Sequence, residues 1–343
     1  MFRRQFLATL TGGAATAALL AVPFGGAGAQ QGPSEILNVS YDIARELFAA
    51  INPAFVDYWK KKTGQEATVK QSHAGTSRQA RAIMEGLQAD VVTFNQVTDI
   101  DMLAKRGGFV ADDWQSKLPN NASPWYSLPA FLVRKGNPKK VKDWPDLAQD
   151  GIKLVFPNPK TSGNARYTYL AGYADALAKS GGDQEKAKAY ARKMLGNVAV
   201  FDTGGRGSTT TFVEREIGDV LITFEAEVFS IRREYGEDKF DVVIPPSSLL
   251  AEFPVAVVDK VAERRGSTTL ARGYLEFLYS EEAQEIVAKN FHRVHNPAIK
   301  AKYSSQFPEV KLLTVEDVFG GWDKATKDHF AEGGILDQVF TKR

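Results

Sequence analysis

The sequence predicts an α/β fold of two lobes, each built on a parallel sheet with helices on both faces. Short apolar runs that indicate strands, at 35–40, 67–70 and 90–94, alternate with helical patterns. Such alternation is typical of parallel sheets covered by helices. The extended apolar segment 125–134 crosses to the second lobe, and we find no low-complexity linker. Two lobes joined by crossing strands can close around a ligand by hinge motion.

The length of 343 residues suits about two domains. We assign residues 30–122 and 225–343 to lobe I and residues 123–224 to lobe II. We expect the strand at 218–224 to lead back to lobe I, and the strands at 242–244 and 253–258 to belong to lobe I.

Local signals set the expected helix boundaries in lobe I. A helix begins near Ala44, and Asn52 and Pro53 should start a second one, as cap and first helical residue. Gly64 should end that helix. In lobe II, Asp183 should cap the helix that follows Gly181 and Gly182.

Composition excludes several function classes. The chain has no cysteine, which removes disulfides, thiol nucleophiles and Cys-ligated metals. The formal net charge is +2, and it falls to zero without Arg3 and Arg4. Such a balance is not the charge pattern of a nucleic-acid or anionic-membrane binder. Any anion must therefore be bound by local geometry.

The first residues predict an export signal. Arg3 and Arg4 precede a weakly apolar run from Ala8 to Phe24, and small residues stand before Gln30. This pattern is typical of a cleaved signal peptide, assigned here to residues 1–29, and it predicts an exported protein. The paired arginines favour the twin-arginine route, with general secretion as the alternative.

The stretch 152–170 organises the predicted site. An apolar strand, Leu154 to Phe156, is followed by a polar turn, Thr161 to Asn164, and then by a helix from about Ala165. The first turn of a helix has unpaired N–H groups and carries partial positive charge, so it binds anions without a basic side chain.

Two other turns share this design, at 72–77 and 204–209. In doubly wound sheets, ligands lie beyond the carboxyl ends of the strands, where such turns gather. Ser162 and Thr76 offer hydroxyls, and Gly163, Asn164 and Gly205 offer backbone N–H groups. The chemistry predicted from these residues is hydrogen bonding to an oxyanion.

Charged residues beside the turns have two possible roles. Arg166 and Arg206 could contact the ligand, but we favour a supporting role in which they hold the loops through carbonyl and carboxylate bonds. Asp42 would repel an anion through its carboxylate, so its backbone N–H would donate while its carboxylate pairs with an arginine. The alternative for Asp42 is a plain helix cap.

The sequence supports a catalytic or a metal-binding function less well than oxyanion binding. His73 with Ser72 or Ser162 could form a hydrolase, yet no Gly-x-Ser-x-Gly motif presents a serine. His292 and His295 have no acidic cluster around them, so we expect no metal site. Tyr167 and Tyr169 could suggest ferric ion, but they alternate along a helix, and a core position is expected. We expect no cofactor.

Several motifs together resemble the periplasmic sulfate- and thiosulfate-binding proteins of ABC importers, over about Leu37 to Leu336. The motifs are NVSYD (38–42), QSHAGTSRQA (71–80), FLVRKGNPK (131–139), PNPKTSGNARY (157–167), DTGGRGSTTTF (202–212), GDVLITFE (218–225) and VFGGW (318–322).

The resemblance implies a type II periplasmic binding fold with the ligand in the cleft between the lobes. It also implies an ionised dianion held by neutral donors. Carried over by motif, these are the N–H groups of Asp42, Thr76, Gly163, Asn164 and Gly205 and the hydroxyl of Ser162.

One position, Phe224, departs from the sulfate branch, where a tryptophan donates to sulfate. The surrounding residues look more like the thiosulfate branch. The outer sulfur of thiosulfate is large and a poor hydrogen-bond acceptor, so a ring face would suit it.

We therefore expect a non-enzymatic, monomeric solute-binding protein that delivers thiosulfate or sulfate to an inner-membrane ABC permease. Another tetrahedral oxyanion such as molybdate is the alternative ligand, and a Ser/His hydrolase is the alternative class. Phosphate should be rejected, because its proton would lack an acceptor.

Overall fold

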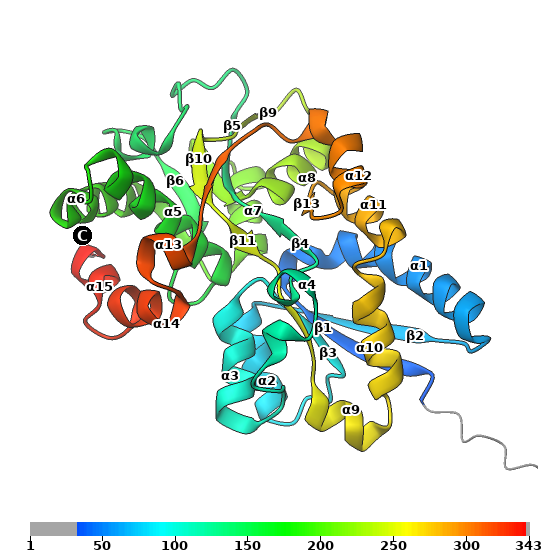
Figure 1. The fold of residues 1–343 in the computed structure, drawn as a ribbon. Coiled ribbons are helices and arrows are strands. Elements are labelled where there is room, and N and C mark those ends of the chain that lie inside the picture. Colours follow the sequence, from blue (N-terminus) through cyan, green and yellow to red (C-terminus); the bar gives the residue numbers. More distant parts are fainter. Residues whose placement is uncertain (1–32, 341–343) are drawn as a thin grey trace, which may run out of the picture. The chain divides into compact units, whose positions relative to one another are not determined.

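The computed structural model describes residues 33–340, in which helices and strands alternate along most of the chain (Figure 1). The expected signal peptide, residues 1–29, lies outside this range. Within residues 33–340, every helix is too short or too polar to cross a membrane.

The first sheet has four strands in the order β12-β3-β1-β2. They are β1 (Glu35–Ser40), β2 (Thr68–His73), β3 (Val91–Thr93) and β12 (Val255–Val257). Strand β1 pairs in parallel with β2 and β3, and β12 runs antiparallel to β3. The associated helices are α1 (Arg45–Thr63), α2 (Thr76–Met84), α3 (Val97–Gly107), α9 (Asp259–Arg265), α10 (Thr268–Phe277) and α11 (Glu281–Lys289). The predicted strand at 35–40 and the expected place of residues 253–258 are confirmed.

The second sheet has five strands in the order β7-β6-β8-β5-β9. They are β5 (Pro129–Arg134), β6 (Leu154–Pro157), β7 (Val198–Asp202), β8 (Val220–Phe224) and β9 (Phe240–Val243). Strand β6 pairs in parallel with β7 and β8, and β5 runs antiparallel to β8 and β9. The helices that follow these strands are α5 (Gly163–Lys179), α6 (Gln184–Gly196), α7 (Gly205–Val213) and α8 (Glu225–Tyr235).

Two expected strand positions were wrong. Residues 218–224 were expected to lead back to the first lobe, but β8 lies inside the five-stranded sheet. All five of its residues are buried, as in a central strand that is covered on both faces. Residues 242–244 were expected in the first lobe, but β9 pairs with β5, and Phe240 packs in the same apolar cluster as Leu132 and Leu221.

Shorter elements connect the two large sheets. Strand β4 (Trp125–Ser127) pairs with β11 (Ala251–Glu252) and β13 (Arg293–Val294), and β10 (Ser247–Leu249) pairs with β14 (Lys311–Leu313). The remaining turns and helices are η1 (Asp42–Ala44), η2 (Trp114–Ser116), α4 (Pro119–Ala122), η3 (Trp144–Ala148), α12 (Pro297–Lys302), η4 (Ser304–Gln306), α13 (Val315–Phe319), α14 (Trp322–Ala325), η5 (Thr326–Phe330) and α15 (Ile335–Val339).

Helix α1 is continuous where two helices were expected. Pro53 lies inside it and leaves the carbonyl of Ala49, an exposed residue, without its usual helical partner. Asn52 does not cap a helix, because its Oδ1 accepts a hydrogen bond from the Tyr274 hydroxyl at 2.8 Å. Gly64 ends α1 in the left-handed conformation, as expected.

The C-terminal helices pack against helices of the five-stranded sheet. Figure 1 shows α15, in red, beside α6, in green, and contacts join the two. Trp322 packs against Tyr167, and His329 against Tyr173, at ring-centroid distances of 5.0 and 4.8 Å. The lobe boundaries at 122/123 and 224/225 stay predictions. These contacts and β9 favour extending lobe II beyond residue 224.

Candidate functional site

The helices α2, α5 and α7 each begin after a short turn that follows the carboxyl end of a strand. The 3₁₀ turn η1 follows β1 in the same way, and α8 follows β8. Strand β1 is parallel to its neighbour β2, and β6 is parallel to both of its neighbours, β7 and β8. These helix starts therefore gather at the carboxyl ends of the parallel strands in each sheet. Their first-turn N–H groups have no acceptor within the helix.

The start of α5 combines a hydroxyl with two backbone donors. Ser162 is the cap residue, and its Oγ accepts from the Ala165 N–H at 3.5 Å. A hydroxyl that accepts in this way keeps its own proton to donate elsewhere. Gly163 and Asn164 are buried, and Asn164 Nδ2 donates to Thr223 Oγ1 at 2.8 Å, which ties α5 to β8.

At the start of α2, the hydroxyl of Thr76 is not free, contrary to the expectation from sequence. It donates to Asp99 Oδ2 at 2.6 Å, and Ser77 Oγ donates to Asp99 Oδ1 at 2.8 Å. Burial raises the pKa of Asp99, while the charge of Arg166 and the two hydroxyls act in the opposite direction. Thr76 therefore has only its backbone N–H to offer a ligand.

The starts of α3 and α5 touch, although they belong to different sheets. A Cβ on Gly163 would lie 3.0 Å from both Asn95 Oδ1 and Gln96 Cβ. Arg166 on α5 donates to Thr98 Oγ1 and to the Pro159 carbonyl, both at 3.3 Å. These are the contacts of a side chain that holds loops together, which is the role we favoured for Arg166.

The starts of α7 and η1 also touch. Asp42 Oδ2 accepts from the backbone N–H of Arg206 at 3.3 Å, and a Cβ on Gly204 would lie 2.9 Å from the same oxygen. The Arg206 guanidinium donates to both oxygens of Glu46, at 3.0 and 3.1 Å. Asp42 thus bonds to the backbone of an arginine, whereas the charged group of that arginine pairs with Glu46.

Phe224 lies between the contact of α3 with α5 and the contact of α7 with η1. It caps α8, is 1% exposed, and packs edge-on against Tyr167 and Phe253 at 5.9 and 5.1 Å between ring centroids. Phe253 in turn packs against Tyr41, the residue before Asp42, at 5.1 Å. The aromatic contacts therefore connect the α5 start with the η1 start.

A cavity of about 300 Å³ adjoins Phe224. Ile43, Arg206 and Glu227 line it with Phe224. Burial raises the pKa of Glu227 to about 7, against the charge of Arg206 and a hydrogen bond from Thr209 Oγ1 at 3.0 Å. A carboxyl with this raised pKa is partly protonated near neutral pH, so it places less negative charge beside a bound anion than an ordinary glutamate would.

The structure therefore brings the predicted residues into two contacting groups. One contains Thr76, Ser162, Gly163, Asn164 and Arg166, and the other contains Asp42, Gly205 and Arg206. Phe224 is linked to both. Their assignment as ligand-binding and supporting residues stays a prediction.

Three neighbouring residues were missed: Asn95, Gln96 and Asp99. Asn95 accepts from Thr76 Oγ1 at 3.2 Å, and Gln96 is fully buried against Gly163. The signal was present in the sequence, because Asn95 and Gln96 lie in a short turn, residues 94–96, between a strand and a helix.

The geometry gives little support to the alternative interpretations, a Ser/His hydrolase or a metal site. The hydroxyl of Ser72 donates to Gln79, and His73 Nδ1 lies 3.3 Å from the Tyr41 carbonyl, so within residues 33–340 neither forms a nucleophile–base pair. Burial lowers the pKa of His292 to about 3. Tyr167 and Tyr169 are buried, as expected. No group of three or more His, Asp or Glu residues within 33–340 could hold a metal ion.

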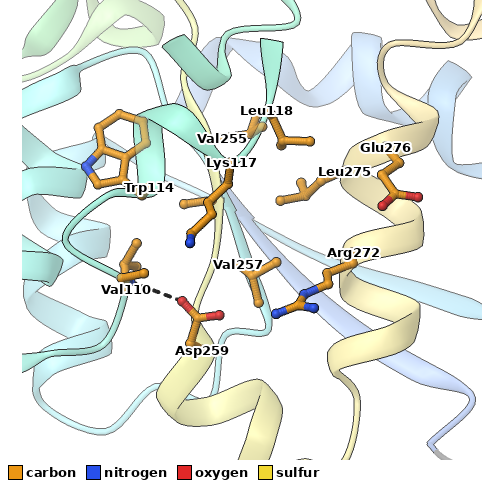
Figure 2. A pocket seen from close by; sticks show the side chains of 12 residues that line it. Val110, Trp114, Lys117, Leu118, Val255, Val257, Asp259, Arg272, Leu275 and Glu276 are labelled. Atoms are coloured by element: carbon orange, nitrogen blue, oxygen red, sulfur yellow. Dashed lines mark hydrogen bonds between the residues drawn. The ribbon is translucent and has the colours of Figure 1, made fainter.

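Another cavity, of about 350 Å³, lies between β12 and α10 (Figure 2). Apolar side chains line it together with Lys117, Arg272 and Asp259, and Asp259 Oδ2 accepts from the Ala111 N–H at 3.1 Å. None of the predicted site residues lines this cavity.

Two α/β sheets with helix starts converging at their strand ends define a periplasmic binding protein fold. The sulfate-binding protein SubI from Mycobacterium tuberculosis H37Rv has this fold, with a TM-score of 0.79, 30% identity, and coverage of 87% of this chain and 100% of that one. The ferric binding protein from Campylobacter jejuni matches with a TM-score of 0.61 at 16% identity, which shows the fold alone. The predicted fold class is confirmed.

The chain belongs to the bacterial extracellular solute-binding protein family, whose model matches residues 42–293. It is 54% identical to the thiosulfate-binding protein of Escherichia coli (strain K12), over 89% of this chain and 91% of that protein. It is 48% identical to the sulfate-binding protein of Salmonella typhimurium (strain LT2), over 89% and 92% of the two chains. The family resemblance inferred from the motifs is confirmed.

Proposed function

We propose that this chain captures thiosulfate, sulfate or both outside the cytoplasm and delivers the anion to an ABC permease. It would act as a monomer, without cofactor and without chemical change to the ligand. The names of its relatives, thiosulfate-binding and sulfate-binding proteins, support this assignment. The predicted export signal supports a periplasmic location.

The observation that carries the proposal is the set of helix starts with uncharged donors. Backbone N–H groups at the starts of α2, α5, α7 and η1, with the Ser162 hydroxyl, would donate to the anion. The nearby cations are engaged elsewhere: Arg206 with Glu46, and Arg166 with Thr98 and a carbonyl. Hydrogen bonds to a charged acceptor contribute about 1.5–3 kcal/mol each, so several of them would hold a dianion tightly.

Phe224 supports a preference for thiosulfate. Its ring is buried and has no N–H or O–H to donate. A sulfate oxygen placed against that ring would lack a hydrogen-bond donor. The large outer sulfur of thiosulfate is a poor hydrogen-bond acceptor, so its binding would be weakened less. Phosphate at neutral pH carries a proton that needs an acceptor, and a lining of donors would leave it unpaired at a cost of about 1–3 kcal/mol.

Competition calorimetry with thiosulfate, sulfate, molybdate and phosphate tests the proposal. We expect tight binding of thiosulfate, weaker or equal binding of sulfate, and much weaker binding of phosphate. Tighter molybdate binding would favour the alternative ligand. Recovery of the released thiosulfate unchanged would argue against the hydrolase alternative, and its hydrolysis or oxidation would contradict the proposal.

A further inference from the structure

Gln96 is a buried amide at the point where the two sheets' helix starts meet. It follows β3 and is the residue before α3, with an extended backbone (φ −151°, ψ 117°). Its side chain is 0% exposed. Within residues 33–340, neither Nε2 nor Oε1 has a hydrogen-bond partner.

The side chain of Gln96 lies against the first turn of α5. A Cβ on Gly163 would be 3.0 Å from Gln96 Cβ and 3.3 Å from Gln96 Oε1. Gly163 is the first residue of α5 and directly follows Ser162. The amide of Gln96 therefore lies beside the backbone donors proposed to bind the anion.

The residue before it has a different role. Asn95 Oδ1 shares the single proton of the Thr76 hydroxyl with Asp99 Oδ2, so this amide has a partner within the protein. Burying an amide with no partner is unfavourable, and most buried polar groups in proteins are paired. A group that accepts a hydrogen bond from Gln96 is therefore missing from the protein's own atoms. An oxyanion at the start of α5 would be such an acceptor once the amide makes a half-turn about its last bond, which exchanges Oε1, the amide atom that lies near Gly163, with Nε2.

We propose that the side-chain amide of Gln96 donates a hydrogen bond to the bound sulfur oxyanion. It would be a binding residue from the first sheet that lies beside the start of α5 in the second. This inference rests on the proposed function. It adds a side-chain donor to a site otherwise built mainly from backbone donors, and it adds a contact that forms only when both halves of the site surround the ligand.

Two substitutions test this proposal by calorimetry with sulfate and thiosulfate. Gln96→Met keeps the length and burial of the side chain but removes the donor, and we expect a Kd at least tenfold higher. Gln96→Glu keeps the shape but places an anionic acceptor beside the ligand at pH 8, and we expect a Kd at least thirtyfold higher. Gln284→Met is the matched control, because Gln284 is also buried, at 2% exposed, but donates to the Pro124 and Leu278 carbonyls. Its Kd should stay within twofold of wild type.

The pH profile separates binding from a purely structural role. A protonated carboxyl has one O–H to donate. The sulfate affinity of Gln96→Glu should therefore recover as the pH falls from 8 to 5, while that of wild type changes less than threefold. Wild-type protein that binds neither anion would contradict the proposed function itself. Wild-type binding together with both Gln96 variants within threefold of it would overturn this inference alone. If Gln96→Met does not fold, a flat pH profile for Gln96→Glu would overturn it.

Discussion

The carboxylate of Asp42 accepts a hydrogen bond from the backbone N–H of Arg206, with 3.3 Å between Oδ2 and the nitrogen, although 164 residues separate the two. This bond ties the start of α7 to η1 and so connects the two sheets. The paired side chains of Arg206 and Glu46 reinforce it, but both are partly exposed, and such pairs contribute only about 0–1 kcal/mol.

Two substitutions of Asp42 should distinguish the effect of its hydrogen bond from the effect of its charge. Asp42→Asn keeps an acceptor for the Arg206 N–H and removes a negative charge near the proposed anion. We expect its Kd for sulfate to be equal to or lower than that of wild type. Asp42→Ala removes the acceptor and should lower the free energy of unfolding by about 1 kcal/mol, as the loss of a helix cap does. A Kd raised more than tenfold in Asp42→Asn would mean that the charge itself is needed.

Ser162→Ala should weaken binding. The hydroxyl accepts from Ala165 and can still donate to the ligand, and its loss leaves a charged acceptor without one donor. We expect a loss of about 1–3 kcal/mol in binding free energy by calorimetry. Ser180→Ala, at the other end of α5, is the control, because that hydroxyl bonds to the Leu177 carbonyl. Equal dissociation constants for Ser162→Ala and wild type would remove Ser162 from the site.

Gly163→Ala should obstruct the contact between the α3 and α5 starts. The new Cβ would lie 3.0 Å from Asn95 Oδ1 and from Gln96 Cβ, closer than such atoms normally approach. We expect the Kd for thiosulfate to rise at least about tenfold, equivalent to about 1.4 kcal/mol. Gly196→Ala is the control, because a Cβ there meets nothing within 4 Å. Unchanged affinity in Gly163→Ala would show that this contact is not maintained when the ligand is bound.

Phe224→Trp should shift selectivity toward sulfate. The indole N–H would supply the donor that phenylalanine lacks. The larger ring must fit between Tyr167 and Phe253, so we also expect a loss of about 1–3 kcal/mol in stability from overpacking. The measurement is the ratio of the sulfate and thiosulfate dissociation constants. The same ratio in both proteins would exclude Phe224 as a determinant of selectivity.

Glu227 should make the stability depend on pH. Burial raises its pKa to about 7 in the folded protein, from an ordinary value of 4.5. Between these values the folded state holds a proton that the unfolded state has released. The contribution of Glu227 is therefore fully present below about pH 4.5 and decreases as the pH rises to about 7, by up to about 3 kcal/mol.

The test of this pH dependence is the melting temperature of wild type and Glu227→Gln from pH 4.5 to 8. The amide oxygen can still accept from Thr209, so the variant should retain that contact. We expect the variant to gain stability relative to wild type as the pH rises. Parallel curves would mean that Glu227 keeps an ordinary pKa in the folded protein.

Much of the site could be predicted from sequence, because each helix start is a local feature. Polar turns after apolar strands indicated where α2, α5 and α7 begin, but each helix starts earlier than expected, at Thr76, Gly163 and Gly205, within the predicted turns. The expectation that the Thr76 hydroxyl is free was wrong, because its partner Asp99 is 23 residues away in the sequence. Periodicity and turn signals carry no information about such pairings.

The errors in the fold have the same origin. Strand β9 pairs with β5 across more than 100 residues, and the short apolar run at 242–244 gave no indication of which sheet it would join. Pro53 was read as a helix start, but the buried residues Leu47, Phe48, Ile51, Phe55 and Trp59 continue at helical spacing across it. Packing of this apolar face keeps α1 continuous in spite of the proline.

A crystal structure of the thiosulfate complex tests the central claim most directly, that uncharged donors from both sheets bind the anion. We predict the backbone nitrogens of Gly163, Asn164 and Gly205 and the Ser162 hydroxyl within about 3.2 Å of the ligand. A ligand held mainly by lysine or arginine side chains, or located in the cavity between β12 and α10, would contradict this account.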